Sequence, residues 1–411
     1  MEWRVDEICD LNKSSLTSKD ILNSIEYLDT SSITENLISS TQKLSIEEAP
    51  SRAKRRVYDE TIVYSTVRPN LKHFGILNRP PENFIVSTGF TTIDIKKEYQ
   101  DRINPYYLYL LLTNQVIVDH LTRIADIAVS SYPSINPSDI GDLAFVFPDK
   151  ETQDNITSQI IPLNEKIILN TRMNAELEAI AKQLYDYWFV QFDFPNAEGK
   201  PYKSFGGKMV WNEKLKREIP EGWEVKDLNF FADTPKESVN PFEHPDKLYK
   251  HYSIPAFDIC GTYLLEKGEA IQSNKFIVNK GQILVPKLNP WYNRILYVDD
   301  NIDSICSTEF VILDSYEEWM KGYLYYIVKS NGFISYCTKA STGTSHSQRR
   351  VNPDILKGFC VPYNKKIVSL YSSIILPQII KMQKNVAQNK EITCFRDSLL
   401  PMLMNGQVTI E

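Results

Sequence analysis

Apolar residues recur every three or four positions through one long segment in each half of the chain, at residues 151–189 and 364–411. This spacing matches the 3.6-residue turn of an α-helix and places the apolar side chains on one face. The residues that carry it are Ile160, Ile167, Leu177 and Leu184 in the first segment and Ile375, Met382, Ile392 and Leu399 in the second. The pattern predicts two long amphipathic helices, and each of them needs an apolar partner.

Each predicted helix offers the other an equivalent apolar stripe, so we expect the two to pack together in antiparallel fashion. Asn170 and Asn174 fall on the first stripe, and Asn385 and Asn389 fall at matched places on the second. Polar residues in a seam between helices set their register and lower their stability. The alternative is that the four asparagines face water.

Shorter runs rich in β-branched and aromatic residues lie before each helix and predict strands. In the first half they cover residues 3–8, 61–64, 84–95 and 143–147, and the spacing over 105–121 predicts a shorter helix.

The second half repeats this order at a nearly constant distance along the chain. Trp3 and Trp223 are 220 residues apart, Asn136 and Asn352 are 216 apart, and Leu184 and Leu399 are 215 apart. Matches that keep their order with so little drift indicate an internal duplication.

Proline and glycine at Pro195, Gly199, Pro201 and Gly206 end the first helix and predict a connector. The predicted fold class is therefore α+β, with two pseudo-two-fold-related domains separated by two long antiparallel helices. The expected segments are a first domain (1–150), a first long helix (151–194), the connector (195–222), a second domain (223–363), and a second long helix with a C-terminal tail (364–411).

Composition is that of an ordinary globular protein, with 42% hydrophobic and 24% charged residues. The sequence has no run of eighteen apolar residues and no basic-then-apolar N-terminus, so we expect a cytoplasmic protein without membrane contact. The six cysteines are scattered and form no CxxC pair, which argues against a metal site.

The formal net charge of −6 argues against binding of nucleic acid through bulk charge. Each half nevertheless holds one basic segment. Residues 51–80 contain seven Arg or Lys against two acids, and residues 336–366 contain six against one. Either segment taken alone could be a solvated face.

Catalytic motifs are poorly represented. The chain has no Walker loop, and Glu82, Asp94 and Lys96 fit a metal-dependent nuclease pattern only loosely, without a counterpart in the second half. Asn104 and Asn289 each begin an incomplete version of the N-P-P-Y loop of methyltransferases, and turn residues explain both better. A duplicated chain without paired catalytic residues is expected to bind rather than to catalyse.

Two loops in each half mix basic, aromatic, hydroxyl and amide side chains, which contact phosphates and base edges in DNA. Together with the basic run at the start of residues 51–80, these loops predict a DNA-binding surface. Its candidate residues in the first half are Arg52, Lys54, Arg55, Arg56, Arg68, Lys72, His73, Ser130, Ser131 and Tyr132. Those in the second half are Lys287, Trp291, Tyr292, Arg294, Thr342, Thr344, Ser345, His346, Gln348, Arg349 and Arg350.

The whole chain resembles the specificity (S) subunits of type I DNA restriction-modification systems. The most specific part is the connector, LYDYWFVQFDFPNAEGKPYKSFGGKMVW followed by IPEGWEV. The strand Gln282 to Val285 that enters a loop, and the polar loop before Asn-Pro, are similar to this family as well.

The resemblance implies a non-catalytic subunit in which each domain reads half of a split, asymmetric target in double-stranded DNA. It implies that the helices space the domains and recruit two methyltransferase (M) subunits, with nuclease-translocase (R) subunits added for restriction. S-adenosylmethionine, ATP and Mg²⁺ are expected in those partners, and no cofactor is expected in this chain.

Aromatic residues at the end of the first helix predict a surface for a partner subunit, because so many exposed rings would be costly in a lone monomer. These are Tyr187, Trp188, Phe189 and Phe192. Two other functions remain open, a stand-alone DNA-binding regulator and a coiled-coil protein scaffold.

Overall fold

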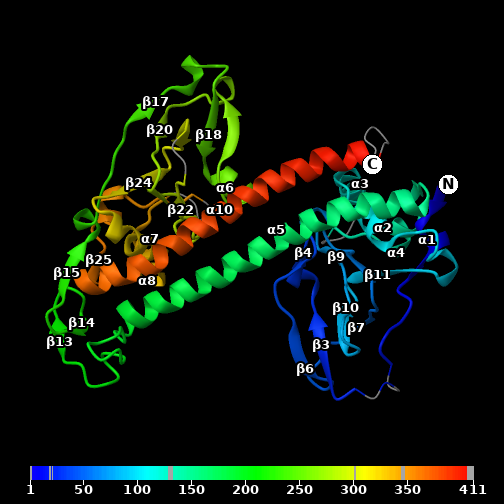
Figure 1. The fold of residues 1–411 in the computed structure, drawn as a ribbon, viewed down its shortest axis with the longest axis horizontal. Helices are drawn as coiled ribbons and strands as arrows, with labels where there is room; N and C mark the ends of the chain where they lie inside the picture. Colours follow the sequence, from blue (N-terminus) through cyan, green and yellow to red (C-terminus); the bar gives the residue numbers. More distant parts are fainter. Residues whose placement is uncertain are drawn as a thin grey trace. The chain divides into compact units, whose positions relative to one another are not determined.

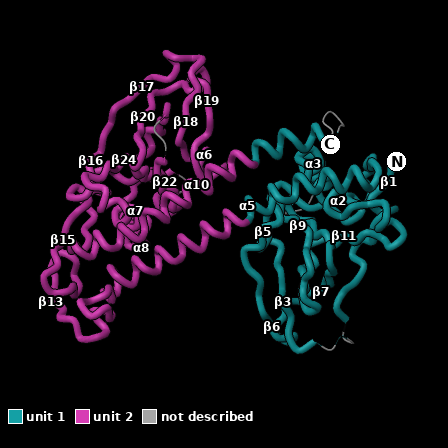
Figure 2. Tube along the Cα trace, viewed as in Figure 1, with its two compact units in different colours: residues 1–168, 393–411 teal, residues 169–392 magenta. Residues whose placement is uncertain are grey.

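The computed structural model describes residues 2–17, 20, 22–127, 133–299, 302–343 and 348–404. The chain forms two compact units, unit 1 (residues 1–168 and 393–411) and unit 2 (residues 169–392), which Figure 2 shows in teal and magenta. Each unit contains part of both long helices, α5 (Lys150–Tyr185) and α10 (Lys365–Met404) (Figure 1). The mixed content and the two long helices confirm the predicted α+β class.

Unit 1 contains two four-stranded sheets. The first has the order β2 (Cys9–Leu11), β11 (Phe90–Ile95), β8 (Ile62–Ser65), β9 (Phe74–Ile76). The second has the order β6 (Gln42–Ser45), β3 (Ser24–Leu28), β10 (Phe84–Ser87), β7 (Ala53–Arg56). Neighbouring strands are antiparallel except β3 and β10, which are parallel. The short strands β1 (Glu2–Arg4) and β12 (Ala144–Val146) form a separate pair, as do β4 (Ile33–Thr34) and β5 (Leu37–Ile38).

The helices of unit 1 correct two predictions. The expected helix over 105–121 is two helices, α2 (Pro105–Leu112) and α3 (Gln115–Ile127), because Asn114 accepts the Val116 amide through its side chain and starts a new helix. The expected strand over 3–8 ends at Arg4, and α1 (Val5–Ile8) is a helical turn capped by the Glu7 carboxylate on the Arg4 amide. The short helix α4 (Pro137–Gly141) precedes β12.

Unit 2 repeats the sheet order of unit 1. Its four-stranded sheet has the order β16 (Ala232–Asp233), β24 (Phe310–Ser315), β21 (Ile283–Pro286), β22 (Leu296–Tyr297). Its five-stranded sheet has the order β17 (Ser238–Val239), β20 (Lys275–Ile277), β23 (Ser304–Cys306), β18 (Leu248–Tyr252), β19 (Leu264–Lys267). The pair β15 (Glu224–Asp227) and β25 (Cys360–Tyr363) corresponds to β1 and β12. The helices are α6 (Ile254–Cys260), α7 (Lys321–Lys329), α8 (Asn331–Ala340) and α9 (Pro353–Lys357).

The registers of the paired strands support the internal duplication, as the order of the strands in the sheets does. In both units one strand pair of the second sheet is parallel, β3 with β10 and β18 with β23. Asp94 of β11 accepts the Thr61 hydroxyl, and Asp314, at the equivalent place in β24, accepts the Gln282 amide. Unit 2 adds only the edge strand β17 to this pattern, and the connector contributes a hairpin, β13 (Met209–Asn212) with β14 (Arg217–Pro220).

The apolar core of each unit contains side chains from both long helices. In unit 1, Ile156 and Ile160 of α5 and Leu403 of α10 belong to one buried cluster. In unit 2, Ala181 of α5 shares a cluster with Tyr371 of α10, whose hydroxyl donates to the Ala181 carbonyl at 3.0 Å. Among the described residues, no helix is both long and apolar enough to cross a membrane.

The four asparagines lie together in unit 2, as the two stripes predict. Asn170 donates to the Asn389 side chain at 2.8 Å, and Asn385 donates to the Asn174 side chain at 2.8 Å. Residue numbers rise along α5 as they fall along α10, so the two helices are antiparallel in this unit. Asn170 and Asn385 are buried, which excludes the alternative that they face water.

The aromatic residues predicted to form a partner surface are mostly interior, so that prediction is wrong for three of its four residues. Trp188, Phe189 and Phe192 are at most 6% exposed, and only Tyr187 is partly exposed. The chain passes from α5 into one π-helical turn, η4 (Asp186–Val190), and Phe192 adopts a left-handed backbone. These turns direct Phe189 onto Tyr323 (ring centroids 4.4 Å apart) and Phe192 onto Trp223 (5.7 Å), so unit 2 itself covers the rings.

Replacing Asn385 with Ala should destabilise unit 2 by about 1–3 kcal/mol, because the part-buried Asn174 oxygen loses its donor. Five of the six tryptophans belong to unit 2, so tryptophan fluorescence during urea unfolding reports mainly on this unit. Lys384→Ala, an exposed change on the preceding residue, is the control and should stay within about 0.5 kcal/mol. Equal midpoints for both variants would contradict a stabilising role for this polar contact.

Candidate nucleic-acid interface

The two loops predicted to contact DNA in the first half lie side by side in unit 1. The loop after β8 forms a β-bridge to the loop before α4, with Val67 opposite Ser134. The Arg68 amide donates to the Pro133 carbonyl at 2.9 Å, and the Ile135 amide donates to a carbonyl of the first loop, also at 2.9 Å. We call these two segments, residues 66–73 and 133–135, the paired loops of unit 1.

Unit 2 builds the same arrangement between the loop after β21 and the loop before α9. Leu288 forms a β-bridge to Arg350, and the Asn289 amide donates to the Arg349 carbonyl at 2.8 Å. The Val351 amide donates to the Lys287 carbonyl at 3.0 Å. Residues 287–294 and 348–351 are the paired loops of unit 2.

The pairing is equivalent in the two units, residue by residue. Val67 and Leu288 are 221 positions apart, and Ser134 and Arg350 are 216 apart, the spacings of the flanking strands and helices. Arg68 and Asn289 also share a left-handed backbone, with φ of 48° and 49°. Asparagine tolerates this region, whereas arginine adopts it at a cost of about 1 kcal/mol or more. The hydrogen bond from the Arg68 amide to the Pro133 carbonyl of the neighbouring loop offsets part of this cost.

In the first loop of unit 1 the predicted Lys72 and His73 make local contacts. Lys72 forms an ion pair with Glu35 at 3.0 Å, and a ring nitrogen of His73 bonds the Ile33 carbonyl at 2.6 Å. Arg68 is exposed. Lys72 and His73 are therefore oriented by contacts within the unit itself.

The basic run of β7 reaches the same region through a shared turn. The Thr88 amide donates to the Arg52 carbonyl at 2.8 Å, and the Thr66 amide donates to the adjacent Gly89 carbonyl at 2.9 Å. Arg52 and Lys54 are exposed, whereas Arg55 and Arg56 are half-buried. Those two arginines contact Ser15 and Asp20 respectively, so they hold the start of the chain against β7.

In unit 2, Tyr292 is the most exposed aromatic residue of the first loop, at 52%. Arg294 lies over its ring at 4.4 Å and forms a two-point ion pair with Asp258 of α6, at 2.7 and 2.8 Å. The Trp291 ring is 5.9 Å away from Tyr292. The guanidinium of Arg294 is therefore committed within the unit and supports an exposed ring suited to stacking.

The second loop of unit 2 holds the two arginines of the RR pair differently. Arg349 donates to the Ser341 carbonyl at 2.6 Å, which stiffens the loop from within. Arg350 forms a two-point ion pair with Glu309, at 3.0 and 3.2 Å, and both side chains remain partly exposed. The neighbouring carboxylate raises the pKa of Arg350. Of the two arginines, Arg350 is therefore the one whose guanidinium could exchange its ion pair with Glu309 for a DNA phosphate.

Ser130, Ser131, Tyr132, Thr344, Ser345 and His346 lie outside the described residues. Of the others, Thr342 pairs through its backbone with Arg350, Gln348 is exposed, and Lys287 is half-buried.

Two acidic residues that bind predicted arginines of this surface were not identified from the sequence. Asp258 and Glu309 each neutralise one predicted arginine, and both lie far from their partners along the chain. Glu309 directly follows Ser307-Thr308, which repeats Ser87-Thr88 of the first half 220 positions later. The described residues contain no group of three His, Cys, Asp or Glu side chains that could hold a metal ion.

Comparison with known proteins points to one family. Residues 1–179 match the family model of the type I restriction modification DNA specificity domain. The chain is 23% identical to the type I restriction enzyme HindI specificity subunit of Haemophilus influenzae, covering 93% of this chain and 94% of that protein. It is also 23% identical to the MjaIX specificity subunit of Methanocaldococcus jannaschii, covering 96% and 87% respectively.

A solved structure shares the fold. The type I restriction-modification S subunit from M. genitalium aligns with a TM-score of 0.59 and 14% identity, covering 98% of this chain and 95% of that chain. The family model covers only the first part of the sequence, and unit 2 repeats the strand order and registers of unit 1.

Glu309→Gln should tighten DNA binding about two- to fivefold at low salt, because Arg350 loses an exposed competing partner worth up to about 1 kcal/mol. Fluorescence anisotropy with a labelled duplex measures this change. Glu317→Gln removes the same charge from an exposed residue outside the paired loops and should leave affinity near the unmodified value. Weaker binding by Glu309→Gln would show that the ion pair itself shapes the binding surface.

Proposed function

We propose that this chain is a specificity subunit of a type I restriction-modification system, and that each of its units reads one half of a split DNA target through its paired loops. One observation carries the proposal: both units pin the same two loops together by equivalent backbone hydrogen bonds. A repeated backbone frame presents two similar surfaces to DNA.

The two half-sites should differ in sequence, because the side chains on the frame differ. Unit 1 presents Arg68 and the oriented Lys72, whereas unit 2 presents Tyr292 and Arg350. Phosphate contacts position a protein on DNA, while contacts to base edges carry the sequence information. The target should therefore be asymmetric, with unread bases between its halves.

The reactions should be carried out by partner subunits. In this proposal two methyltransferase subunits supply S-adenosylmethionine chemistry, and nuclease-translocase subunits supply ATP- and Mg²⁺-dependent restriction. The exposed apolar side chains along the outer faces of the long helices in unit 2 support such docking. They include Ile180 of α5 and Leu370 and Ile374 of α10.

A domain exchange tests the reading of half-sites. Replacing residues 223–362 with the equivalent segment of a relative should change one half of the methylated motif and leave the other half intact, because each unit has its own frame. Sequencing of methylated positions in cells that also carry the methyltransferase partner measures the result. The matched exchange of residues 2–148 should change only the other half.

An ungapped motif, or an exchange that altered both halves at once, would end this proposal. Purification of the tagged chain separates the remaining alternatives. Recovery with two methyltransferase chains supports the specificity-subunit function, whereas a lone chain that binds DNA tightly supports a stand-alone regulator.

A further inference from the structure

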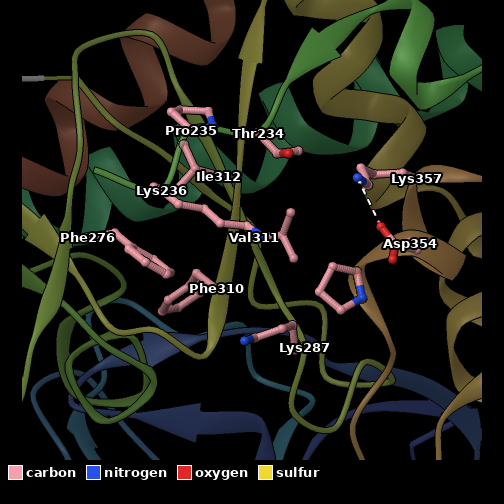
Figure 3. Close-up of a pocket in the computed structure, with 11 residues that line it drawn as sticks. Thr234, Pro235, Lys236, Phe276, Lys287, Phe310, Val311, Ile312, Asp354 and Lys357 are labelled. Carbon is pink, nitrogen blue, oxygen red and sulfur yellow. Dashed lines mark ion pairs between the residues drawn. The ribbon is translucent and has the colours of Figure 1, made fainter. Parts of the chain in front are cut away.

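A pocket of about 180 Å³ lies in unit 2 directly beside the paired loops (Figure 3). Its apolar floor includes the rings of Phe276 and Phe310. Three lysines line it: Lys236 from the segment between β16 and β17, Lys287 from the end of β21, and Lys357 from α9. In Figure 3, Lys236 and Lys357 extend into the pocket from opposite sides.

The positive charge in the pocket is only partly neutralised. Lys357 pairs with Asp354 at 3.1 Å. Among the described residues, no carboxylate forms an ion pair with Lys236 or Lys287. The pocket thus combines three lysines and one carboxylate with the two aromatic rings. This combination suits a ligand that has an anionic group attached to an apolar part.

The pocket shares its wall with the DNA-reading surface. Lys287 is the first residue of the paired loops, and its backbone bonds Glu309 on one side and Val351 on the other. Pro353, another lining residue, comes two positions after Val351. A strand bound along the paired loops would therefore pass the mouth of the pocket.

The described residues of unit 1 contain no equivalent cluster of lysines. Through the strand registers and the matched helices, the three lysines correspond to Lys13, Thr66 and Gly141. Lys13 pairs with Asp10 at 3.4 Å. A Cβ added at Gly141 would lie 3.1 Å from the Leu11 side chain, so apolar atoms take up space where unit 2 has its pocket.

We propose that this pocket holds a backbone phosphate of the DNA half-site bound by unit 2, with the adjoining deoxyribose against Phe276 and Phe310. Lys236 and Lys287 donate to the phosphate oxygens, and Lys357 remains beside Asp354. The inference rests on the proposed function and adds an anchor that unit 1 lacks. Such a contact fixes the position of the strand without reading its bases.

The test uses the complex with its methyltransferase partner and a duplex that contains the full target. The double variant Lys236→Ala with Lys287→Ala should bind about tenfold more weakly. The slope of log K against log salt should fall by about one unit, because one phosphate contact is lost. The methylated motif should remain unchanged in both halves. The double variant Lys236→Arg with Lys287→Arg keeps the charge and should retain the slope.

The control is Lys214→Ala with Lys280→Ala, which removes two exposed lysines of unit 2 that do not line the pocket. This control should leave both affinity and slope unchanged. A scan of uncharged methylphosphonates along the duplex then locates the phosphate. At one position in the half-site of unit 2, the substitution should weaken the unmodified complex about tenfold and leave the Lys→Ala double variant unaffected.

Three outcomes would overturn the pocket assignment. They are an unchanged slope in the Lys→Ala double variant, additive effects at every methylphosphonate position, and a change in the motif itself, which would mean that these lysines read bases. Binding and a split motif in the unmodified complex are measured alongside. Failure of these would refute the proposed function rather than the pocket.

Discussion

Backbone hydrogen bonds between two loops fix the peptide frame that carries candidate reading side chains such as Arg68 in unit 1 and Arg350 in unit 2. Side-chain bonds alone would leave long residues such as Arg68 free to sample many rotamers, at an entropic cost when DNA orders them. The bridge between Val67 and Ser134, and its equivalent between Leu288 and Arg350, fix the peptide frame before DNA binds. Affinity and specificity then depend on which side chains the frame carries.

Duplication explains how one chain could hold the two different readers of the proposed function. The sheets keep their order and the parallel strand pair in both units, because strand registers are set by the buried faces and a one-residue slip would expose them. The loops between the strands carry no such constraint. Unit 2 accordingly carries an ion-paired Arg294 over the ring of Tyr292 and a lysine-lined pocket, on sheets that keep the strand order of unit 1.

Periodicity in the sequence predicted the parts of the structure whose packing repeats. The two helices and the contacts of Asn170 and Asn385 followed from spacing, because each stripe had one available partner. The paired loops were predicted as separate loops, and only the structure shows the bridges that join them. Trp188 and Phe189 were misassigned because spacing records that rings are apolar but not which surface covers them.

The acidic partners Asp258 and Glu309 and the lysine-lined pocket could not be predicted from the sequence, for a related reason. Glu309 and Arg350 are 41 positions apart, and Lys236 and Lys357 come from elements that only folding brings together. Pairwise chemistry of this kind leaves no periodic pattern. The break between α2 and α3 at Asn114 is different, since the residue is a known helix-capping type and its position could have been weighed more heavily.

Hydrogen–deuterium exchange of the chain in complex with the proposed methyltransferase partner tests the central claim most directly. Hydrogen exchange at the amides of the paired loops, at 66–73 and 287–294, should slow in both units when the duplex with the methylated target is added. A scrambled duplex should slow this exchange far less. Protection confined to one unit, or protection elsewhere with both paired loops unchanged, would contradict the account of two readers built on one repeated frame.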